Sequence, residues 1–260
     1  MKKTLLASGC SFTEEDFFSA IHPEMICNWP KWPELLAKKL DMNHINLGKS
    51  GAGNEYIYSS LLEQILKTKD KSTIGLVTAA WSQCQRKDYQ SGENFTWRHK
   101  RIDEDGDVFS FIRKDLRYMI SLQLVCQRFN IPLKQFQMIS LFDGFISGLR
   151  KTDAELADNK DNKFFITRYH YRPVGLTSKE DRGTCDKILI EYEPYINQED
   201  FIGWPISSRI GGFHVEEKAL RYFGHPFPNY RKELLVSDKD VHPNKEGHEK
   251  IAEFLYDRLG

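Results

Sequence analysis

The sequence predicts an α/β fold, in which helices cover both faces of a parallel sheet. Short apolar runs at 5–8, 44–47 and 74–81 alternate with helical patterns at 32–40 and 57–66. This alternation of strand and helix is typical of a doubly wound parallel sheet. The run at 74–81 is almost continuously apolar, as expected for a strand that is buried on both faces.

The first and last helices are predicted from apolar residues at helical spacing. One face of the first helix carries Trp32, Leu35, Leu36 and Leu40. Pro33 stands near its start, where proline is well tolerated. In the last helix Ile251, Leu255 and Leu259 share a face, and Asn244 is a plausible N-cap.

Beyond the third strand the alternation breaks. Residues 83–114 are polar and rich in turn formers, whereas 116–129 predict a buried helix and 131–139 a fourth strand. Residues 141–235 combine a highly charged stretch with aromatic clusters. We interpret 141–235 as a long insertion or lid that precedes the last helix.

Composition narrows the class of protein. The chain has 260 residues, enough for a full core, and we expect a single domain spanning 1–260. Lys and Arg together number 37, as do Asp and Glu, so no basic surplus favours a nucleic acid or an anionic membrane as partner. The sequence has neither a membrane-spanning apolar run nor the apolar region of a signal peptide, and its five cysteines form no C-x-x-C pair. We therefore expect a soluble, cytoplasmic protein without a structural metal.

Ser11 is the candidate nucleophile. It follows the first strand across Gly9, on a turn that holds its hydroxyl at the carboxyl edge of the sheet, where open α/β sheets place their ligands. The polar residues 13–16 that come next predict the start of a helix. A nucleophilic serine also requires a base, an acid that orients the base, and donors for the oxyanion.

The base and acid are predicted just before the last helix. Asp240 and His242 lie two residues apart on one short loop, and the first and last elements of a parallel sheet can be neighbours. We favour Asp240 as the orienting acid and keep Asp238 as the alternative. Backbone N–H groups of Gly51 and Ser11 are candidate oxyanion donors.

A third oxyanion donor is predicted at the end of the third strand. The hydroxyl of Ser82 stands at that point and can donate one hydrogen bond. Its orientation is less fixed than that of a side-chain amide.

Four segments, in this order, resemble the SGNH/GDSL hydrolase superfamily. The matching residues are Gly9–Ser11 for the G-D-S block, Trp32–Leu36 for the W-P-x-L-L of the first helix, Asn46 with Gly51 for the second block, and Asp240 with His242–Pro243 for the last block. The resemblance covers about residues 1–86 and 236–259. It implies a flavodoxin-like, three-layer fold in which Ser11 is the nucleophile and Gly51 contributes to the oxyanion hole.

Three positions depart from the family pattern. Cys10 replaces the aspartate of G-D-S, and Ser82 stands where the family has an oxyanion asparagine. The usual spacing is D-x-x-H, but Lys239 occupies the position three residues before His242. Together with the G-C-S-F opening, this short spacing is similar to a divergent branch that includes bacteriophage proteins.

The sequence therefore predicts a serine esterase without metal or cofactor, acting on a small-molecule or glycan ester such as an acetylated carbohydrate. The substrate class rests on the family resemblance alone. Two alternatives stay open: a catalytically weakened binding or assembly module on the same fold, and an acyltransferase with the same triad. The acyl group, the alcohol and the oligomeric state are not predicted.

Overall fold

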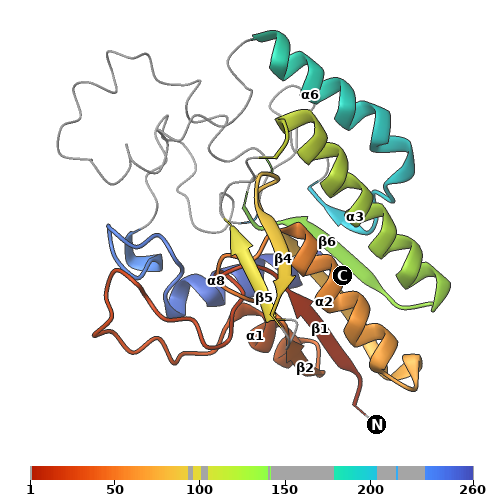
Figure 1. The fold of residues 1–260 in the computed structure, drawn as a ribbon. Coiled ribbons are helices and arrows are strands. Elements are labelled where there is room, and N and C mark those ends of the chain that lie inside the picture. Colours follow the sequence, from red (N-terminus) through yellow and green to blue (C-terminus); the bar gives the residue numbers. More distant parts are fainter. Residues whose placement is uncertain are drawn as a thin grey trace, which may run out of the picture.

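The computed structural model describes residues 2–92, 96–100, 105–139, 141, 179–203, 215 and 232–259. Five parallel strands form its central sheet in the order β2-β1-β3-β6-β7 (Figure 1). They are β1 (Thr4–Ser8), β2 (Asn43–Asn46), β3 (Ile74–Trp81), β6 (Leu133–Gln137) and β7 (Phe201–Ile202). The first strand lies inside the sheet and the order reverses beside it, which is the flavodoxin-like arrangement. The predicted fold class is confirmed.

Helices cover both faces of this sheet. They are α1 (Trp32–Lys39), α2 (Asn54–Lys67), α3 (Val108–Arg128), α6 (Lys179–Tyr192) and α8 (Lys245–Tyr256), with short 3-10 turns at Lys71–Thr73, Glu193–Tyr195 and Lys232–Leu234. α1 and α8 pack against each other over one apolar cluster, and α2, α3 and α6 contribute to the other. The result is three layers, helix on sheet on helix.

Strand β1 supplies both layers, because successive side chains of a strand point to opposite faces. Leu5 and Ala7 belong to the cluster under α1 and α8, whereas Leu6 belongs to the cluster under α2 and α3. All three are buried. Burying a leucine side chain contributes about 1.5–3 kcal/mol, so β1 anchors the turn that follows it firmly.

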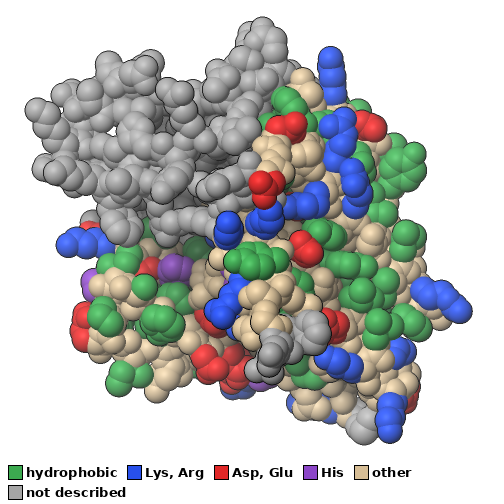
Figure 2. All heavy atoms as spheres, viewed as in Figure 1, with side chains coloured by type: hydrophobic (Ala, Val, Ile, Leu, Met, Phe, Trp, Pro, Cys, Tyr) green, Lys and Arg blue, Asp and Glu red, His purple; other side chains and the backbone are tan. Residues whose placement is uncertain are grey.

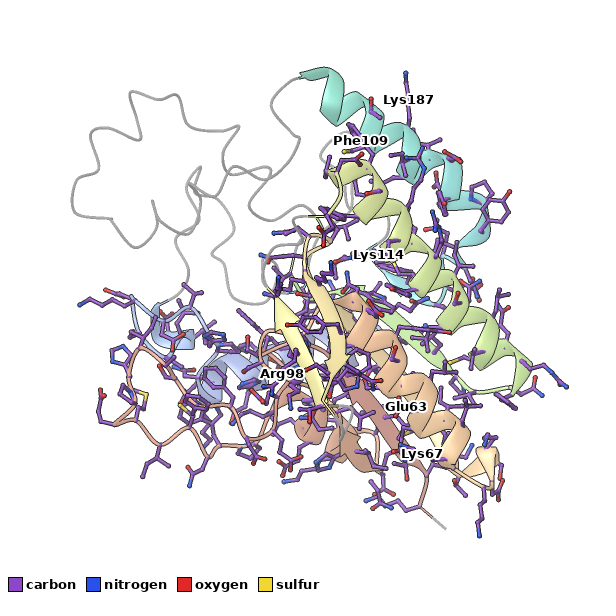
Figure 3. All side chains as sticks on the ribbon, in the orientation of Figure 1. Glu63, Lys67, Arg98, Phe109, Lys114 and Lys187 are labelled. Atoms are coloured by element: carbon purple, nitrogen blue, oxygen red, sulfur yellow. The ribbon has the colours of Figure 1, made fainter. Side chains whose placement is uncertain are left out.

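Helix α2 illustrates how the outer layers divide their residues. Ile57, Leu61 and Ile65 are fully buried on its inner face. Glu63 and Lys67 lie one turn apart on its outer face, where their side chains form an ion pair of 3.2 Å (Figure 3). The pattern is that of an amphipathic helix covering a sheet.

The region 83–114 holds structure that the sequence did not predict. A two-stranded antiparallel hairpin, β4 (Lys87–Ser91) and β5 (Thr96–Lys100), follows β3. Helix α3 begins at Val108, earlier than its apolar pattern predicted. Asp107 causes this early start, since its carboxylate accepts a hydrogen bond of 2.7 Å from the Ser110 N–H in a capping box.

The helix predicted to begin at 13–16 is absent from this described part of the chain, and the prediction was wrong. In the structure the chain makes turns at 11–13 and 15–16 and then runs without a helix as far as Trp32. The acidic residues 14–16 include no apolar residue that could give an amphipathic face, and Pro23 and Pro30 interrupt the remainder of the segment.

Part of the predicted insertion 141–235 belongs to the main fold. Helix α6 packs on α3, and β7 pairs with β6 as the fifth strand of the sheet. Phe109 and Lys114 on α3 and Lys187 on α6 mark this pair of helices in Figure 3. Residues 179–203 are therefore not an insertion. The stretches 142–178, 204–214 and 216–231, on which the lid interpretation also rests, lie outside the described residues.

Figure 2 shows basic, acidic and apolar side chains interspersed over the coloured part of one face. This mixture fits the equal numbers of acidic and basic residues. None of the described helices combines the length and apolar character needed to cross a bilayer.

Candidate active site

Ser11 lies in the turn directly after β1, at the carboxyl edge of the sheet. The Thr13 N–H donates to the carbonyl of Cys10 over 2.8 Å, which closes this turn. Gly9 lets the turn lie close to β3, because a Cβ there would come within 2.9 Å of Thr13 Cβ and 3.0 Å of Ala80 Cβ. The close packing fixes the position of the turn that carries Ser11, whose side chain stays partly exposed.

His242 and Asp240 lie in line with Ser11, although they come from the other end of the chain. His242 Nε2 is 2.9 Å from Ser11 Oγ, and His242 Nδ1 is 2.5 Å from Asp240 Oδ1. With the carboxylate accepting the proton of Nδ1, Nε2 can accept the proton of the serine hydroxyl. The structure thus brings together the three residues that the sequence singled out.

The short D-x-H spacing has a local explanation. Asp240 Oδ1 accepts a hydrogen bond of 3.2 Å from the backbone N–H of His242 as well as the contact from its ring. A carboxylate that bonds the N–H two residues on forms an Asx turn, which folds the loop so that acid and imidazole face each other. Asp238, the alternative acid, is exposed, and Asp240 is the carboxylate that contacts the ring.

Burial and hydrogen bonding act in opposite directions on Asp240, whose side chain is 2% exposed. Burial alone would raise its pKa, but the hydrogen bonds from His242 and Ser19 and the charge of the imidazole lower the pKa to about 2. The carboxylate is therefore ionised at neutral pH and can orient the imidazole. Ser19 Oγ donates to the second oxygen, Oδ2, over 2.5 Å.

Two aromatic rings hold the His242 ring from the sides. The ring centroids of Phe12 and Phe17 lie 5.1 Å and 4.5 Å from that of His242. Both phenylalanines are buried. Their packing restricts rotation of the imidazole and leaves its Nε2 directed at Ser11.

The loop that carries His242 is tied to helix α8. Asn244 Oδ1 accepts from the Gly247 N–H over 3.0 Å, which confirms the predicted N-cap. The Asn244 amide also donates to the carbonyls of Glu233 and Leu235, over 2.7 Å and 3.0 Å. One side chain therefore caps the helix and closes the base of the loop.

Asn46 connects the nucleophile turn with the glycine-rich loop after β2. Its amide donates to the carbonyl of Thr13 over 2.6 Å and accepts from the Gly48 N–H over 2.9 Å. Gly51, in the same loop, has φ +79°, a conformation that favours glycine. Within the described part of the chain, neither the Gly51 N–H nor the Ser11 N–H donates to another atom. Among the described residues, therefore, no acceptor occupies either donor.

Ser82 is placed differently from Gly51. Its side chain is fully buried, and its hydroxyl has no hydrogen-bond partner among the described residues. Asn54 holds its backbone instead, accepting from the Ser82 N–H over 2.7 Å and donating to the Ser82 carbonyl over 3.0 Å. The same amide contacts Asp115, whose carboxyl pKa is raised by burial. The role of the Ser82 hydroxyl in an oxyanion hole stays a prediction.

Sequence patterns do not indicate Ser19, Phe12 or Phe17 as parts of the site. Ser19 and Asp240 are separated by 221 positions, so no local pattern connects them. Among the described residues, no group of three or more His, Cys, Asp or Glu side chains is arranged to hold a metal ion.

No protein-family model matches the chain, and no curated protein matches it. Solved structures do. A proposed lipolytic protein of the G-D-S-L family from Desulfitobacterium hafniense DCB-2 has 12% identity and a TM-score of 0.49, over 99% of this chain and 100% of that one. The chain is similar to SGNH hydrolases.

Two further structures are of the same kind. An acetyl xylan esterase from the rumen bacterium Butyrivibrio proteoclasticus has 12% identity and a TM-score of 0.46, over 99% of this chain and 63% of that one. A proposed SGNH hydrolase from Slackia heliotrinireducens has 11% identity and a TM-score of 0.43, over the full length of both chains. Likeness at this distance assigns neither an activity nor a substrate.

Proposed function

We propose that the protein is a serine ester hydrolase with Ser11 as nucleophile, His242 as general base and Asp240 as the orienting acid. The observation that carries the proposal is the hydrogen-bonded line from Ser11 Oγ through His242 to Asp240, with distances of 2.9 Å and 2.5 Å. Nucleophile, base and orienting carboxylate at hydrogen-bond distance are the arrangement that activates a serine hydroxyl.

In the proposed reaction Ser11 Oγ attacks the ester carbonyl carbon while its proton passes to His242 Nε2. The imidazolium is stabilised by the ionised Asp240 carboxylate and then gives the proton to the departing alcohol. Water attacks the resulting acyl-serine with His242 again as base, which releases the acid and restores Ser11. His242 thus passes the proton of Ser11 to the departing alcohol in the first half of the cycle, and the proton of water to Ser11 Oγ in the second half.

The tetrahedral intermediates carry a negative oxygen, for which we propose the backbone N–H groups of Ser11 and Gly51 as donors. Both are available in the described part of the chain. Loss of one oxyanion donor typically costs about 10²–10³ in rate. The Ser82 hydroxyl is proposed as a third donor, and because it is buried it would need a local adjustment to reach the oxyanion.

For the substrate we propose an ester of a small acyl group, such as acetyl, on a carbohydrate alcohol, on the basis of the motif resemblance to SGNH/GDSL esterases. An acyltransferase would use the same triad with an acceptor alcohol in place of water. Product analysis with candidate acceptors distinguishes the two reactions.

The proposal is tested with p-nitrophenyl acetate turnover and with a fluorophosphonate that labels activated serines. We expect Ser11→Ala to lower kcat by about 10⁴-fold or more and to abolish labelling. Ser72→Ala is a matched control, since Ser72 lies at the opposite end of β3, where its hydroxyl and N–H both bond Asp70. Background turnover by the wild type, without labelling, would contradict the proposal and favour a binding module.

A further inference from the structure

Ser19 is the second hydrogen-bond partner of Asp240, and it comes from the irregular segment that follows the nucleophile turn. We propose that Ser19 is a positioning residue: its hydroxyl holds the Asp240 carboxylate in the orientation in which that carboxylate meets His242. The inference rests on the proposed function of Ser11, His242 and Asp240.

The geometry gives the Ser19 hydroxyl one direction in which to donate. Its Oγ accepts the backbone N–H of His22 over 2.9 Å, and it lies 2.5 Å from Asp240 Oδ2. An ionised carboxylate can only accept, so the hydroxyl proton points at Oδ2. Ser19 is completely buried, so its hydroxyl is shielded from bulk water.

The two oxygens of Asp240 thereby have separate tasks. Oδ1 contacts the ring and the backbone N–H of His242, and Oδ2 accepts from Ser19. Without the Ser19 hydroxyl, Oδ2 would be a buried, charged oxygen lacking its donor. Such an atom is costly, and the carboxylate would gain by rotating away from the imidazole.

A second contact ties the same segment to the same loop. His22 Nε2 lies 2.7 Å from Ser237 Oγ. The same Oγ accepts the backbone N–H groups of Lys239 and Asp240 over 3.1 Å and 3.0 Å. Because Ser237 Oγ receives two N–H donors, its own proton goes to His22. Residues 19–22 therefore hold the turn 237–240 at two points, and Ser19 lies at the point nearest the imidazole.

Ser19→Ala tests the role directly. The hydrogen bond from Ser19 to the ionised Asp240 carboxylate is of the stronger, charge-assisted kind. Its loss should therefore lower kcat by about 10- to 100-fold and change KM by less than about twofold. Ser19→Thr keeps the hydroxyl and should recover most of the loss. Ser60→Ala is the matched control, since it likewise removes one side-chain hydrogen bond of a serine, here the bond of 2.8 Å to Ser8, and Ser60 contacts none of Ser11, His242 and Asp240. Equal losses in Ser19→Ala and Ser60→Ala would overturn the inference.

A double-mutant cycle shows whether Ser19 acts through Asp240. In an Asp240→Asn background the Ser19→Ala change should cost less than about twofold, since the carboxylate that Ser19 positions is already gone. A fall as large as in the wild-type background would mean that Ser19 acts elsewhere, and the inference would be wrong.

A spectroscopic measurement separates this inference from the proposed function. The proton between His242 Nδ1 and Asp240 should give a far-downfield NMR signal that survives in Ser11→Ala protein. We expect Ser19→Ala to shift or remove this signal and Ser60→Ala to leave it unchanged. If the wild type neither hydrolyses esters nor reacts with the fluorophosphonate, the proposed function fails, but the NMR signal still tests whether Ser19 positions Asp240. If the signal is unchanged in Ser19→Ala, the inference about Ser19 is overturned.

Discussion

The described part of the molecule contains two aspartate–histidine pairs of nearly the same internal geometry. Asp240 and His242 approach to 2.5 Å between Oδ1 and Nδ1, and Asp88 and His99 to 2.7 Å between the same atoms. Both carboxylates are buried, with side-chain exposures of 2% and 0%. The difference lies in the surroundings of the second ring nitrogen. Nε2 of His242 contacts Ser11, whereas Nε2 of His99 is buried with no partner among the described residues.

The remaining contacts of the two carboxylates differ in the same way. Asp88 accepts the backbone N–H groups of Gly53 and Tyr56, over 2.9 Å and 2.8 Å, at the start of helix α2. It therefore caps the helix from the neighbouring hairpin, and His99 packs against the Tyr56 ring at 5.2 Å. An aspartate beside a histidine is thus no sign of catalysis by itself. A nucleophile must face the other nitrogen.

The largest expected contrast is between His242→Ala and His99→Ala. Removing His242 takes away the proposed base, so kcat should fall by about 10⁴-fold or more. Removing His99 should leave kcat within about threefold and lower stability by about 1–3 kcal/mol, since Asp88 loses a buried partner. Steady-state kinetics and thermal unfolding of both variants make the comparison. Similar kinetic losses in the two variants would erase the distinction between the pairs.

A second contrast compares Asp240→Asn with Asp88→Asn. In Asp240→Asn the new side-chain amide can donate to His242 Nδ1, which places the imidazole proton on Nε2. Because Nε2 then cannot accept the proton of the Ser11 hydroxyl, we expect kcat to fall by about 10³–10⁴-fold. Asp88→Asn weakens a helix cap and should cost about 1–2 kcal/mol of stability with little change in kcat. Kinetics together with denaturant unfolding measures both quantities. Near-normal turnover in Asp240→Asn would remove Asp240 from the mechanism.

The two pairs also show how far the sequence can be interpreted. Asp240 and His242 lie two residues apart beside a predicted helix, so their loop is conspicuous in the sequence alone. Asp88 and His99 lie on opposite strands of a polar hairpin, and each strand lacks the apolar alternation that would have revealed it. Their pairing is a property of the register, which the sequence does not display.

The strength of the local sequence pattern also explains which other elements were predicted correctly and which were missed. Strand β3 is predicted at the bounds the structure has, 74–81, because an almost continuously apolar run of this length fits a strand that is buried on both faces. Strand β7 has only two residues, too few to establish a period, and it lies in a segment whose composition suggests a lid. Ser19 meets Asp240 only in three dimensions, across 221 positions of sequence.

Gly51 lies close to the second pair, and its substitution sharpens the comparison further. Its φ of +79° disfavours any side chain by about 1–2 kcal/mol, although among the described residues a Cβ would meet only His99 Cβ, at 3.5 Å. Gly51→Ala should therefore shift the loop and lower kcat about 10-fold by moving the proposed oxyanion donor. Gly92→Ala is the matched control, since Gly92 has the same φ with no described atom within 4 Å. If both variants keep full kcat, Gly51 is only a turn residue.

A third histidine gives the smallest and most pH-dependent effect. Burial, aided by the charges of Lys31 and His242, lowers the pKa of His248 from 6.5 to about 3. The Nδ1 atom of His248 accepts a hydrogen bond of 3.3 Å from the backbone N–H of Trp32. Since the unfolded chain binds this proton more readily, stability from His248 is complete above pH 6.5 and declines as the pH falls toward 3.

The decline amounts to at most about 1.4 kcal/mol for each pH unit. His248→Gln should be less stable than the wild type at about pH 7, yet lose less of its melting temperature between about pH 6.5 and about pH 4.5. Parallel melting curves over that range would show that His248 is not the group responsible. Unlike the ring of His242, the ring of His248 is fully buried and bonds the backbone N–H of Trp32. We therefore expect His248 to hold α8 against α1 and to take no part in proton transfer.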